Sequence, residues 1–361
     1  MEHIENDSKY AGLSVNKGIS QPPSVNPNLA RKAKRKLYTA AEYVNGITKG
    51  DISLLGQAVT LIESSNPDHY NLAQEVIEKC LPLSGNSTRI GITGVPGAGK
   101  STFIEALGVL LVNKGDKLAV LAIDPSSERS KGSILGDKTR MEELSASDKA
   151  FIRPSPSAGS LGGVARKTRE TIVLCEAAGF NKVFVETVGV GQSETAVHSM
   201  VDFFLLLQIT GAGDELQGIK RGIMEMADGI IINKAEGNNI ERANLAQAQY
   251  INALHLFPAH ESGWKPQVLK CSAFQKAGIE EIWNMIEEYT QFTKRNGYFA
   301  HKRRSQTKYW MYETIDGKLK SNFYSNPIIS AKLSQLEQQV MKDEVSSFIA
   351  AHKLLEEYFK M

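Results

Sequence analysis

The sequence predicts an α/β fold in which a mostly parallel sheet of seven strands carries helices on both faces. Short apolar runs without polar alternation, separated by segments of helical periodicity, are typical of parallel strands buried on both faces. The predicted strands are Arg89–Thr93, Leu118–Ile123, Ala150–Arg153, Lys182–Glu186, Phe203–Ile209, Gly229–Asn233 and Gln267–Ser272. The predicted helices are Thr102–Asn113, Ala165–Ala178, Gly218–Met226, Ile240–Leu256 and Ile279–Arg295. Because such sheets bind ligands at the carboxyl ends of their strands, the segments after the strands are the candidate sites.

The segment after the first strand, Gly94 to Ser101, fits the phosphate-binding pattern G-x-x-x-x-G-K-[ST] in its required strand–loop–helix setting. Its glycines let backbone N–H groups turn toward phosphate oxygens, and the helix N-terminus adds partial positive charge. Lys100 is expected to reach the β- and γ-phosphates, and the Ser101 hydroxyl to bind Mg²⁺. The nucleotide-binding residues predicted in this loop are Gly94, Val95, Pro96, Gly97, Ala98, Gly99, Lys100, Ser101 and Thr102.

Two aspartates follow the second strand. Asp124 lies at the strand tip in Asp-Pro-Ser-Ser, and Asp137 lies in the loop Gly132–Arg140. A carboxylate beside a phosphate loop can hold a magnesium-bound water or polarise the attacking water. The alternative for Asp124 is a simple turn, since Asp-Pro-Ser favours one. The predicted metal ligands are Ser101, Asp124, Asp137 and Glu186.

The fourth strand ends in Glu186-Thr-Val-Gly189-Val-Gly-Gln192-Ser-Glu194. An acid at the end of an apolar strand, with glycine three residues on, is typical of a Walker B site joined to a γ-phosphate sensor. The N–H of Gly189 would bind the γ-phosphate in the triphosphate state only, which would make this loop a switch. Gln192 is placed to orient the hydrolytic water. The predicted catalytic residues are Lys100, Asp124, Glu186 and Gln192.

The sixth strand ends in Asn233-Lys234-Ala235-Glu236, which approximates the guanine-reading element N-K-x-D. There the carboxylate accepts hydrogen bonds from guanine N1–H and N2–H₂, a donor pair that adenine lacks. The asparagine braces the base edge and the phosphate loop, and the lysine stem stacks on the ring. Glu236 adds one methylene, so guanine preference survives with a slight backbone shift and is otherwise relaxed. The segment Cys271-Ser272-Ala273, where the last predicted strand ends, resembles the final guanine-contacting loop of GTPases, so Ser272 and Ala273 are predicted nucleotide-binding residues.

Composition leaves few other classes of partner. The net charge of +2 supports neither a nucleic-acid nor a membrane partner. Cys80, Cys175 and Cys271 are widely spaced without metal-ligand spacing, so we expect small core residues and a reducing compartment. The sequence has no run of 18 apolar residues, and its acidic N-terminus lacks an apolar signal core. We therefore expect a cytoplasmic protein.

With these sites placed, the chain resembles the MeaB/ArgK-type P-loop GTPases, the G-protein chaperones of adenosylcobalamin-dependent methylmalonyl-CoA mutase. Two highly specific stretches are ETVGVGQSE at 186–194 and GAGDELQGIKRG at 211–222. The other matching stretches are Gly94–Thr102, Ala122–Ser127, Gly132–Met141, Arg153–Glu170, Asn233–Gly237 and Cys271–Ala273. Glu236 is a departure, since the family usually has aspartate there.

The resemblance implies a G domain of the signal-recognition-particle and MinD-like class that binds GTP, GDP and Mg²⁺ and hydrolyses GTP slowly. It implies a mutase partner whose cofactor loading and protection depend on the nucleotide state. Gly132–Arg140 and Gly189–Glu194 become two switches, and Asp214, Glu215 and Lys220 belong to a third that signals to the partner. The alternative is a transport-linked ATPase or kinase of the arginine/ornithine type. It would need an acceptor site and adenine preference, which the N-K-x-E element argues against.

The flanking segments complete the expected organisation. In the N-terminal extension, Asp51 and Asn66-Pro67 mark helix starts, and the basic run at 31–36 is more simply a solvated helix start than a nucleic-acid contact. Residues 327–360 carry an apolar stripe that must be buried against the core or a second subunit, so we expect a homodimer. The predicted parts are a flexible arm at 1–29, a helical extension at 30–85, a P-loop GTPase domain at 86–297 and a helical dimerisation arm at 298–361.

Overall fold

The computed structural model describes residues 37–64, 66–123, 141–154, 161–187, 193–210 and 221–360. By its contacts the chain divides into two units, Met1–Tyr38 and Thr39–Met361. The description below concerns the second unit.

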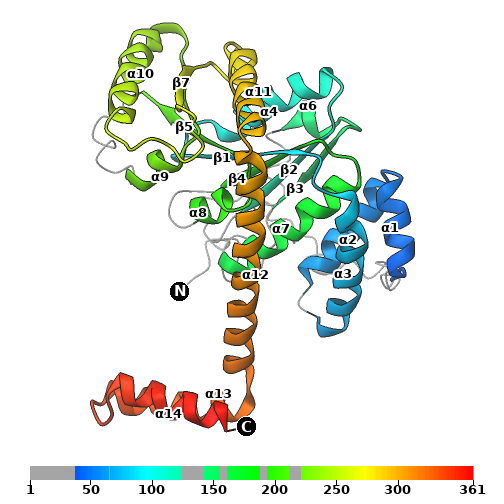
Figure 1. Ribbon diagram of the computed structural model, residues 1–361, viewed down its shortest axis with the longest axis vertical. Helices are drawn as coiled ribbons and strands as arrows, with labels where there is room; N and C mark the ends of the chain where they lie inside the picture. The colour runs from blue at the N-terminus through cyan, green and yellow to red at the C-terminus, as the bar shows by residue number, and fades with distance from the viewer. Residues whose placement is uncertain are drawn as a thin grey trace, which may run out of the picture. The chain divides into compact units, whose positions relative to one another are not determined.

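Seven parallel strands form one sheet in the order β3-β2-β4-β1-β5-β6-β7, which confirms the predicted fold class (Figure 1). Their bounds are β1 Thr88–Gly94, β2 Leu118–Ile123, β3 Ala150–Arg153, β4 Lys182–Thr187, β5 Phe203–Ile209, β6 Gly229–Asn233 and β7 Gln267–Lys270. The central strands are buried along nearly their whole length, as the apolar runs predict. The last strand ends at Lys270 rather than Ser272, because Ser272 pairs with Ala277 in an antiparallel bridge that closes a turn.

Helices cover the two faces of the sheet (Figure 1). On one face lie α4 (Lys100–Asn113), the short α6 (Glu142–Ser145) and α11 (Ile279–Arg295), with Phe103, Leu107 and Ile286 fully buried in the core. On the other lie α7 (Leu161–Ala177) and α8 (Ser193–His198). The helices α9 (Arg221–Met226) and α10 (Ile240–Leu254) contact β5, β6 and β7, and two short 3₁₀ turns are Leu81–Leu83 and Gly237–Asn239.

Three helices precede the sheet, and their predicted start signals are confirmed. They are α1 (Ala40–Thr48), α2 (Ile52–Glu63) and α3 (Pro67–Cys80). The Asp51 carboxylate accepts hydrogen bonds from the first amides of α2, and Asn66 does the same before Pro67 in α3. The group packs against α7 on the second face.

Three helices also follow α11: α12 (Tyr298–Ser325), α13 (Pro327–Met341) and α14 (Ser347–Phe359). Within the predicted helical arm at 298–361, the apolar periodicity indicates helices only for residues 327–360, whereas α12 is continuous over 28 residues. The buried residues of α12, Lys302, Gln306 and Trp310, all lie in its first half, and its second half leaves the domain (Figure 1). A helix buried along only part of its length has no continuous apolar stripe, which is why the periodicity missed it.

Within the part of the chain that the structure describes, we find no helix that combines the length and the apolar character needed to cross a membrane.

Candidate nucleotide-binding site

The phosphate loop joins the end of β1 to the start of α4. Gly94 lies against β5: a Cβ there would collide with the carbonyl oxygen of Leu207, and φ is 155°. Gly99 has φ 86°, and a Cβ there would lie 2.7 Å from Nδ2 of Asn233. Both positions therefore require glycine, for the backbone angle and for the close approach. No side chain among the described residues caps the N-terminus of α4, which leaves this helix end to a phosphate.

Lys100 folds back over this loop. Its Nζ donates hydrogen bonds to the carbonyl oxygens of Gly94, at 2.9 Å, and Val95, at 3.4 Å. Burial lowers the pKa of Lys100, while the carboxylates of Glu186 and Glu194 act in the opposite direction. The Lys100 ammonium group is thus held by two carbonyl oxygens of the phosphate loop, and a bound phosphate would offer it charged oxygens as stronger acceptors.

Glu186 lies one residue before the end of β4 and is 6% exposed. It is in register with Ile92 of β1, two residues before the phosphate loop, and with Ala122 of β2. The next residue of each strand reinforces this junction, since the hydroxyl of Thr187 donates to that of Thr93 at 2.9 Å. Glu186 is thus beside the loop, as the sequence predicts.

Magnesium would need oxygen ligands at this edge. Two of the four predicted ligands, Ser101 and Glu186, are described, and a hydroxyl and a carboxylate are oxygen donors of the kind Mg²⁺ prefers. Among the described residues, no group of three or more His, Cys, Asp and Glu side chains could hold a metal ion. Bound Mg²⁺ supplies neutralisation of phosphate charge.

The remaining predicted loop residues lie outside the described residues. These are Asp124, Asp137, Gly189, Gln192, Asp214, Glu215 and Lys220.

The guanine-reading segment is tied to the phosphate loop through one side chain. Asn233, 2% exposed at the end of β6, donates from Nδ2 to the carbonyl oxygen of Ala98 at 2.8 Å. Its Oδ1 accepts from the backbone N–H of Ala273 at 3.0 Å and from Cys271 Sγ at 3.3 Å. One amide therefore joins the phosphate loop, as expected for this asparagine, to the turn after β7, a contact that the sequence did not predict.

Glu236 faces the same turn, and its longer side chain has a partner. The hydroxyl of Ser272 donates to Oε2 of Glu236 and accepts the N–H of Gln275 at 3.0 Å. A backbone hydrogen bond connects the same two segments, since the N–H of Ala235 donates to the carbonyl oxygen of Cys271 at 2.9 Å. Lys234 is exposed and has φ 60°, an uncommon left-handed backbone angle for a residue other than glycine.

The structure adds contacts to what the sequence predicts for Glu194, at the end of an expected switch, and for Cys271, in the turn after β7. Glu194 is 1% exposed in the first turn of α8 and acts electrostatically on Lys100. Its position eight residues after Glu186 was visible in the sequence, but burial of a charged side chain is a tertiary property. Cys271 is buried as predicted for a core residue, and in addition its thiol bonds Asn233.

The far end of α8 gives a pH-dependent prediction. Burial lowers the pKa of His198 from 6.5 to about 4. The positive charges of Lys302 and His260 lower this pKa further, and the carboxylate of Asp228 partly offsets them. Between those values the unfolded chain binds more protons than the folded one, so stability is full above pH 6.5 and falls on acidification toward pH 4. His198→Gln should flatten this limb of the stability profile, measured as urea midpoints at pH 7, 5.5 and 4.5. His352→Gln, at an exposed position of α14, should leave the limb as in the wild type; an unchanged limb in His198→Gln would contradict the assignment.

Comparison with known proteins agrees with this arrangement. The family model described as "Methylmalonyl Co-A mutase-associated GTPase MeaB" matches residues 55–328. The GTPase ArgK of Escherichia coli is 47% identical over 288 residues, covering 80% of this chain and 87% of that protein. The mitochondrial methylmalonic aciduria type A homolog of Mus musculus is 44% identical over 333 residues, covering 90% of this chain and 79% of that protein. The crystal structure of an LAO/AO transport system kinase, 37% identical, superposes with a TM-score of 0.72 and covers 90% of this chain and 100% of that one. The chain therefore belongs to the MeaB family of P-loop GTPases.

Proposed function

We propose that this protein binds GTP with Mg²⁺, hydrolyses it slowly to GDP and phosphate, and uses its nucleotide state to regulate an adenosylcobalamin-dependent acyl-CoA mutase of the methylmalonyl-CoA type. In this proposal residues 86–297 form the nucleotide domain, preceded by the helical extension at 30–85. Lys100 and Ser101 hold the phosphates and the metal, and Glu186 acts on the metal or the water. The three free cysteines are buried, which fits a reducing cytoplasm.

The guanine assignment rests on the hydrogen bonds by which Asn233 connects the phosphate loop to the turn after β7. Its amide links Ala98 of the phosphate loop to Ala273, while Ser272 of the same turn holds the Glu236 carboxylate. These hydrogen bonds hold the phosphate loop close to the segment that would contact the base, Asn233–Glu236 and the turn after β7. A carboxylate held there accepts the two N–H donors of guanine, whereas adenine leaves it without them.

Calorimetric titration tests the assignment. The wild-type chain should bind GTP at least about 100-fold more tightly than ATP, because the part-buried Glu236 carboxylate would accept two N–H donors from guanine and adenine offers neither. Glu236→Gln should weaken GTP binding, since the amide offers only one acceptor oxygen. Glu241→Gln, on the exposed first turn of α10, is the matched control and should bind GTP as the wild type does. Equal or tighter ATP binding would favour the transport-linked ATPase or kinase instead.

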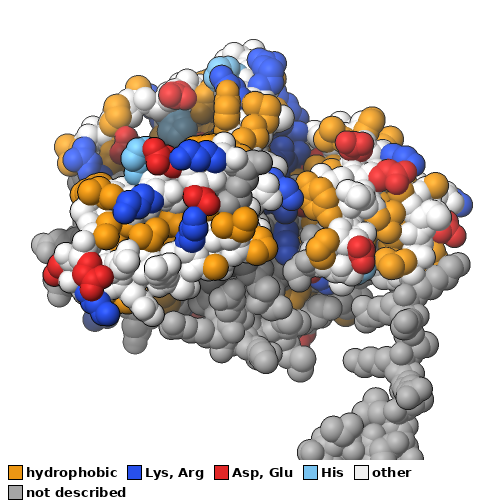
Figure 2. Space-filling model, turned by 90° about the horizontal axis from the view of Figure 1, so that it is seen from below, with side chains coloured by type: hydrophobic (Ala, Val, Ile, Leu, Met, Phe, Trp, Pro, Cys, Tyr) orange, Lys and Arg blue, Asp and Glu red, His pale blue; other side chains and the backbone are white. Residues whose placement is uncertain are grey.

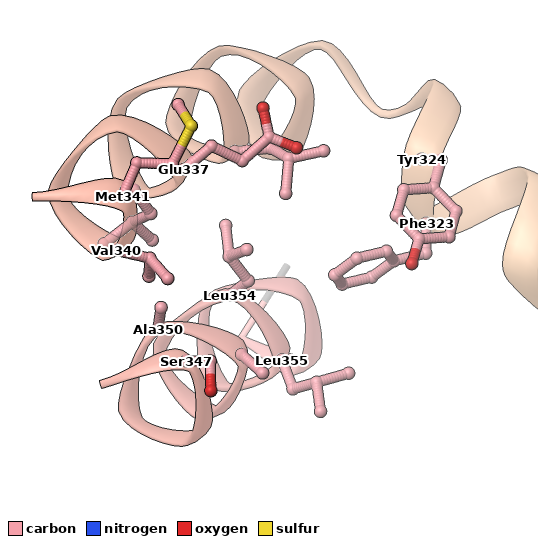
Figure 3. A pocket seen from close by; sticks show the side chains of 12 residues that line it. Phe323, Tyr324, Glu337, Val340, Met341, Ser347, Ala350, Leu354 and Leu355 are labelled. Atoms are coloured by element: carbon pink, nitrogen blue, oxygen red, sulfur yellow. The ribbon is translucent and has the colours of Figure 1, made fainter. Parts of the chain in front are cut away.

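We also propose that the protein is a homodimer made by residues 298–361, and the C-terminal helices support this. Pairs of helices that leave large apolar side chains in water are typical of interfaces. Here Phe348 is 86% exposed and Phe359 79%, and the face seen in Figure 2, from the α13–α14 end, shows hydrophobic side chains between charged ones. Beside them an open groove of about 560 Å³ runs between α13 and α14 and is closed by Phe323 at one end (Figure 3). Leu336, Val340 and Leu354 line it and give a second copy apolar surface to fill.

The double variant Phe348→Asp and Phe359→Asp should be monomeric in light scattering, because it places charges in the proposed interface. Both positions are exposed, so the fold should be kept. Leu256→Asp, an equally exposed position after α10, should stay dimeric. Removal of residues 327–361 should also give monomers; a dimer that persists in both variants would place the interface elsewhere.

A further inference from the structure

The short helix α8 lies between the phosphate loop and α12. At its start, Glu194 is buried and acts on Lys100. In its middle, Val197 packs on Gly91 of β1 so closely that a Cβ on Gly91 would lie 2.8 Å from Val197 Cγ1. Since β1 runs directly into the phosphate loop, α8 rests on the strand that carries the loop and begins immediately after Gln192.

The far end of α8 is capped by side chains of α12. Gln306 donates from Nε2 to the carbonyl oxygens of Val201, at 2.8 Å, and His198, at 3.4 Å. Trp310 donates from Nε1 to Ser199 O at 3.0 Å, and Lys302 from Nζ to Asp202 O at 2.7 Å. The three donors are four residues apart and so share one face of α12. Together they bind four carbonyl groups of residues 198–202, of which those of His198 and Ser199 lie at the helix end, where carbonyls lack partners within the helix. The Asp202 carbonyl oxygen also accepts from the Tyr289 hydroxyl at 3.2 Å.

A helix as short as α8 depends on such contacts. It has six residues, and isolated helices of that length are not stable in water. Its position is therefore set by what it packs on and by what caps it. Gln306 and Trp310 are 6% and 8% exposed, so their hydrogen bonds are shielded from water.

We propose that Gln306 and Trp310 are positioning residues for the nucleotide site: by holding the α8–β5 turn they keep α8 packed on β1, the strand that leads into the phosphate loop, and so set the relative affinity for GTP and GDP. This inference rests on the proposed GTPase function. Because coupling between two sites is reciprocal, nucleotide exchange should in turn change how firmly α12 is held. The position of α12, the first helix of the C-terminal arm, would thereby depend on the bound nucleotide although α12 does not contact it.

Two variants of the full chain test the proposal. Gln306→Leu removes the amide donor, and Trp310→Phe removes only the indole N–H. Each should raise hydrogen exchange of residues 193–202 and change the ratio of dissociation constants for a non-hydrolysable GTP analogue and GDP by at least about 5-fold. Lys308→Leu, on the exposed side of the same helix, should change neither. A shift in kcat for GTP with little change in KM would accompany the effect.

Hydrogen exchange and the affinity ratio together distinguish failure of the proposal from failure of the proposed function. Faster exchange with an unchanged affinity ratio would overturn the proposal and leave the caps as structural contacts. Unchanged exchange would overturn the capping itself. If Gln306→Leu fails to fold, Trp310→Phe decides alone. A wild-type chain that binds neither nucleotide would overturn the proposed function, a result visible before any variant is made.

Discussion

Replacing Lys100 with alanine is expected to weaken binding of GTP by at least about 30-fold and to abolish measurable hydrolysis. Truncating one partner of a buried, hydrogen-bonded charge pair costs about 2–5 kcal/mol, and the γ-phosphate would lose its cation. The fold should survive, because the hydrogen bonds of Lys100 in the described structure go to carbonyl oxygens of its own loop. Isothermal titration with a non-hydrolysable GTP analogue measures the loss.

Lys114→Ala is the matched control. Lys114 follows the last residue of the same helix and pairs at the surface with Glu280, so its removal should leave nucleotide affinity unchanged. If Lys100→Ala bound the analogue as tightly as the control, the phosphate-loop assignment would be lost.

The second large effect is expected at Asp202, on the opposite edge of the sheet. This carboxylate, 2% exposed, accepts hydrogen bonds from Arg303 Nε at 2.8 Å and from the backbone N–H of Arg89 at 2.8 Å. Glu176 holds the Arg89 side chain at 2.7 Å, so the cluster joins β1, β5, α7 and α12. Asp202→Ala leaves Arg303 without its buried partner and should reduce the free energy of unfolding by about 3 kcal/mol or more.

Urea denaturation measures this loss as a lower midpoint. Glu280→Ala, which removes an exposed carboxylate from a surface pair, should leave the midpoint in place. Equal midpoints for the two variants would show that the Asp202 cluster does not stabilise the fold.

Much of the sheet follows from the sequence because its strands are short, apolar and bounded by turn residues. The strand Phe203–Ile209 is predicted residue for residue, since five consecutive apolar residues begin it and Gln208 is its only polar residue. The phosphate loop was equally readable, because Gly94 and Gly99 are required by backbone geometry as well as by the motif.

What the sequence did not predict depends on contacts between distant residues. The second half of α12 has no apolar stripe from which a helix could be predicted. Trp310 donates a hydrogen bond to the carbonyl oxygen of Ser199, which lies more than 100 residues earlier in the sequence. The bond from Ser272 to Glu236 also needs the folded turn, although the two residues were each singled out. Motifs thus predict which residues bind the nucleotide, while the supporting bonds appear only in three dimensions.

The most direct test of the central proposal is association with an adenosylcobalamin-dependent methylmalonyl-CoA mutase in the presence of GDP and of a non-hydrolysable GTP analogue. We predict a complex whose dissociation constant differs by at least about 5-fold between the two nucleotides, because the nucleotide state is the signal. The Lys100→Ala variant should lose this difference. A complex of equal affinity with both nucleotides, or no complex with either, would contradict the account.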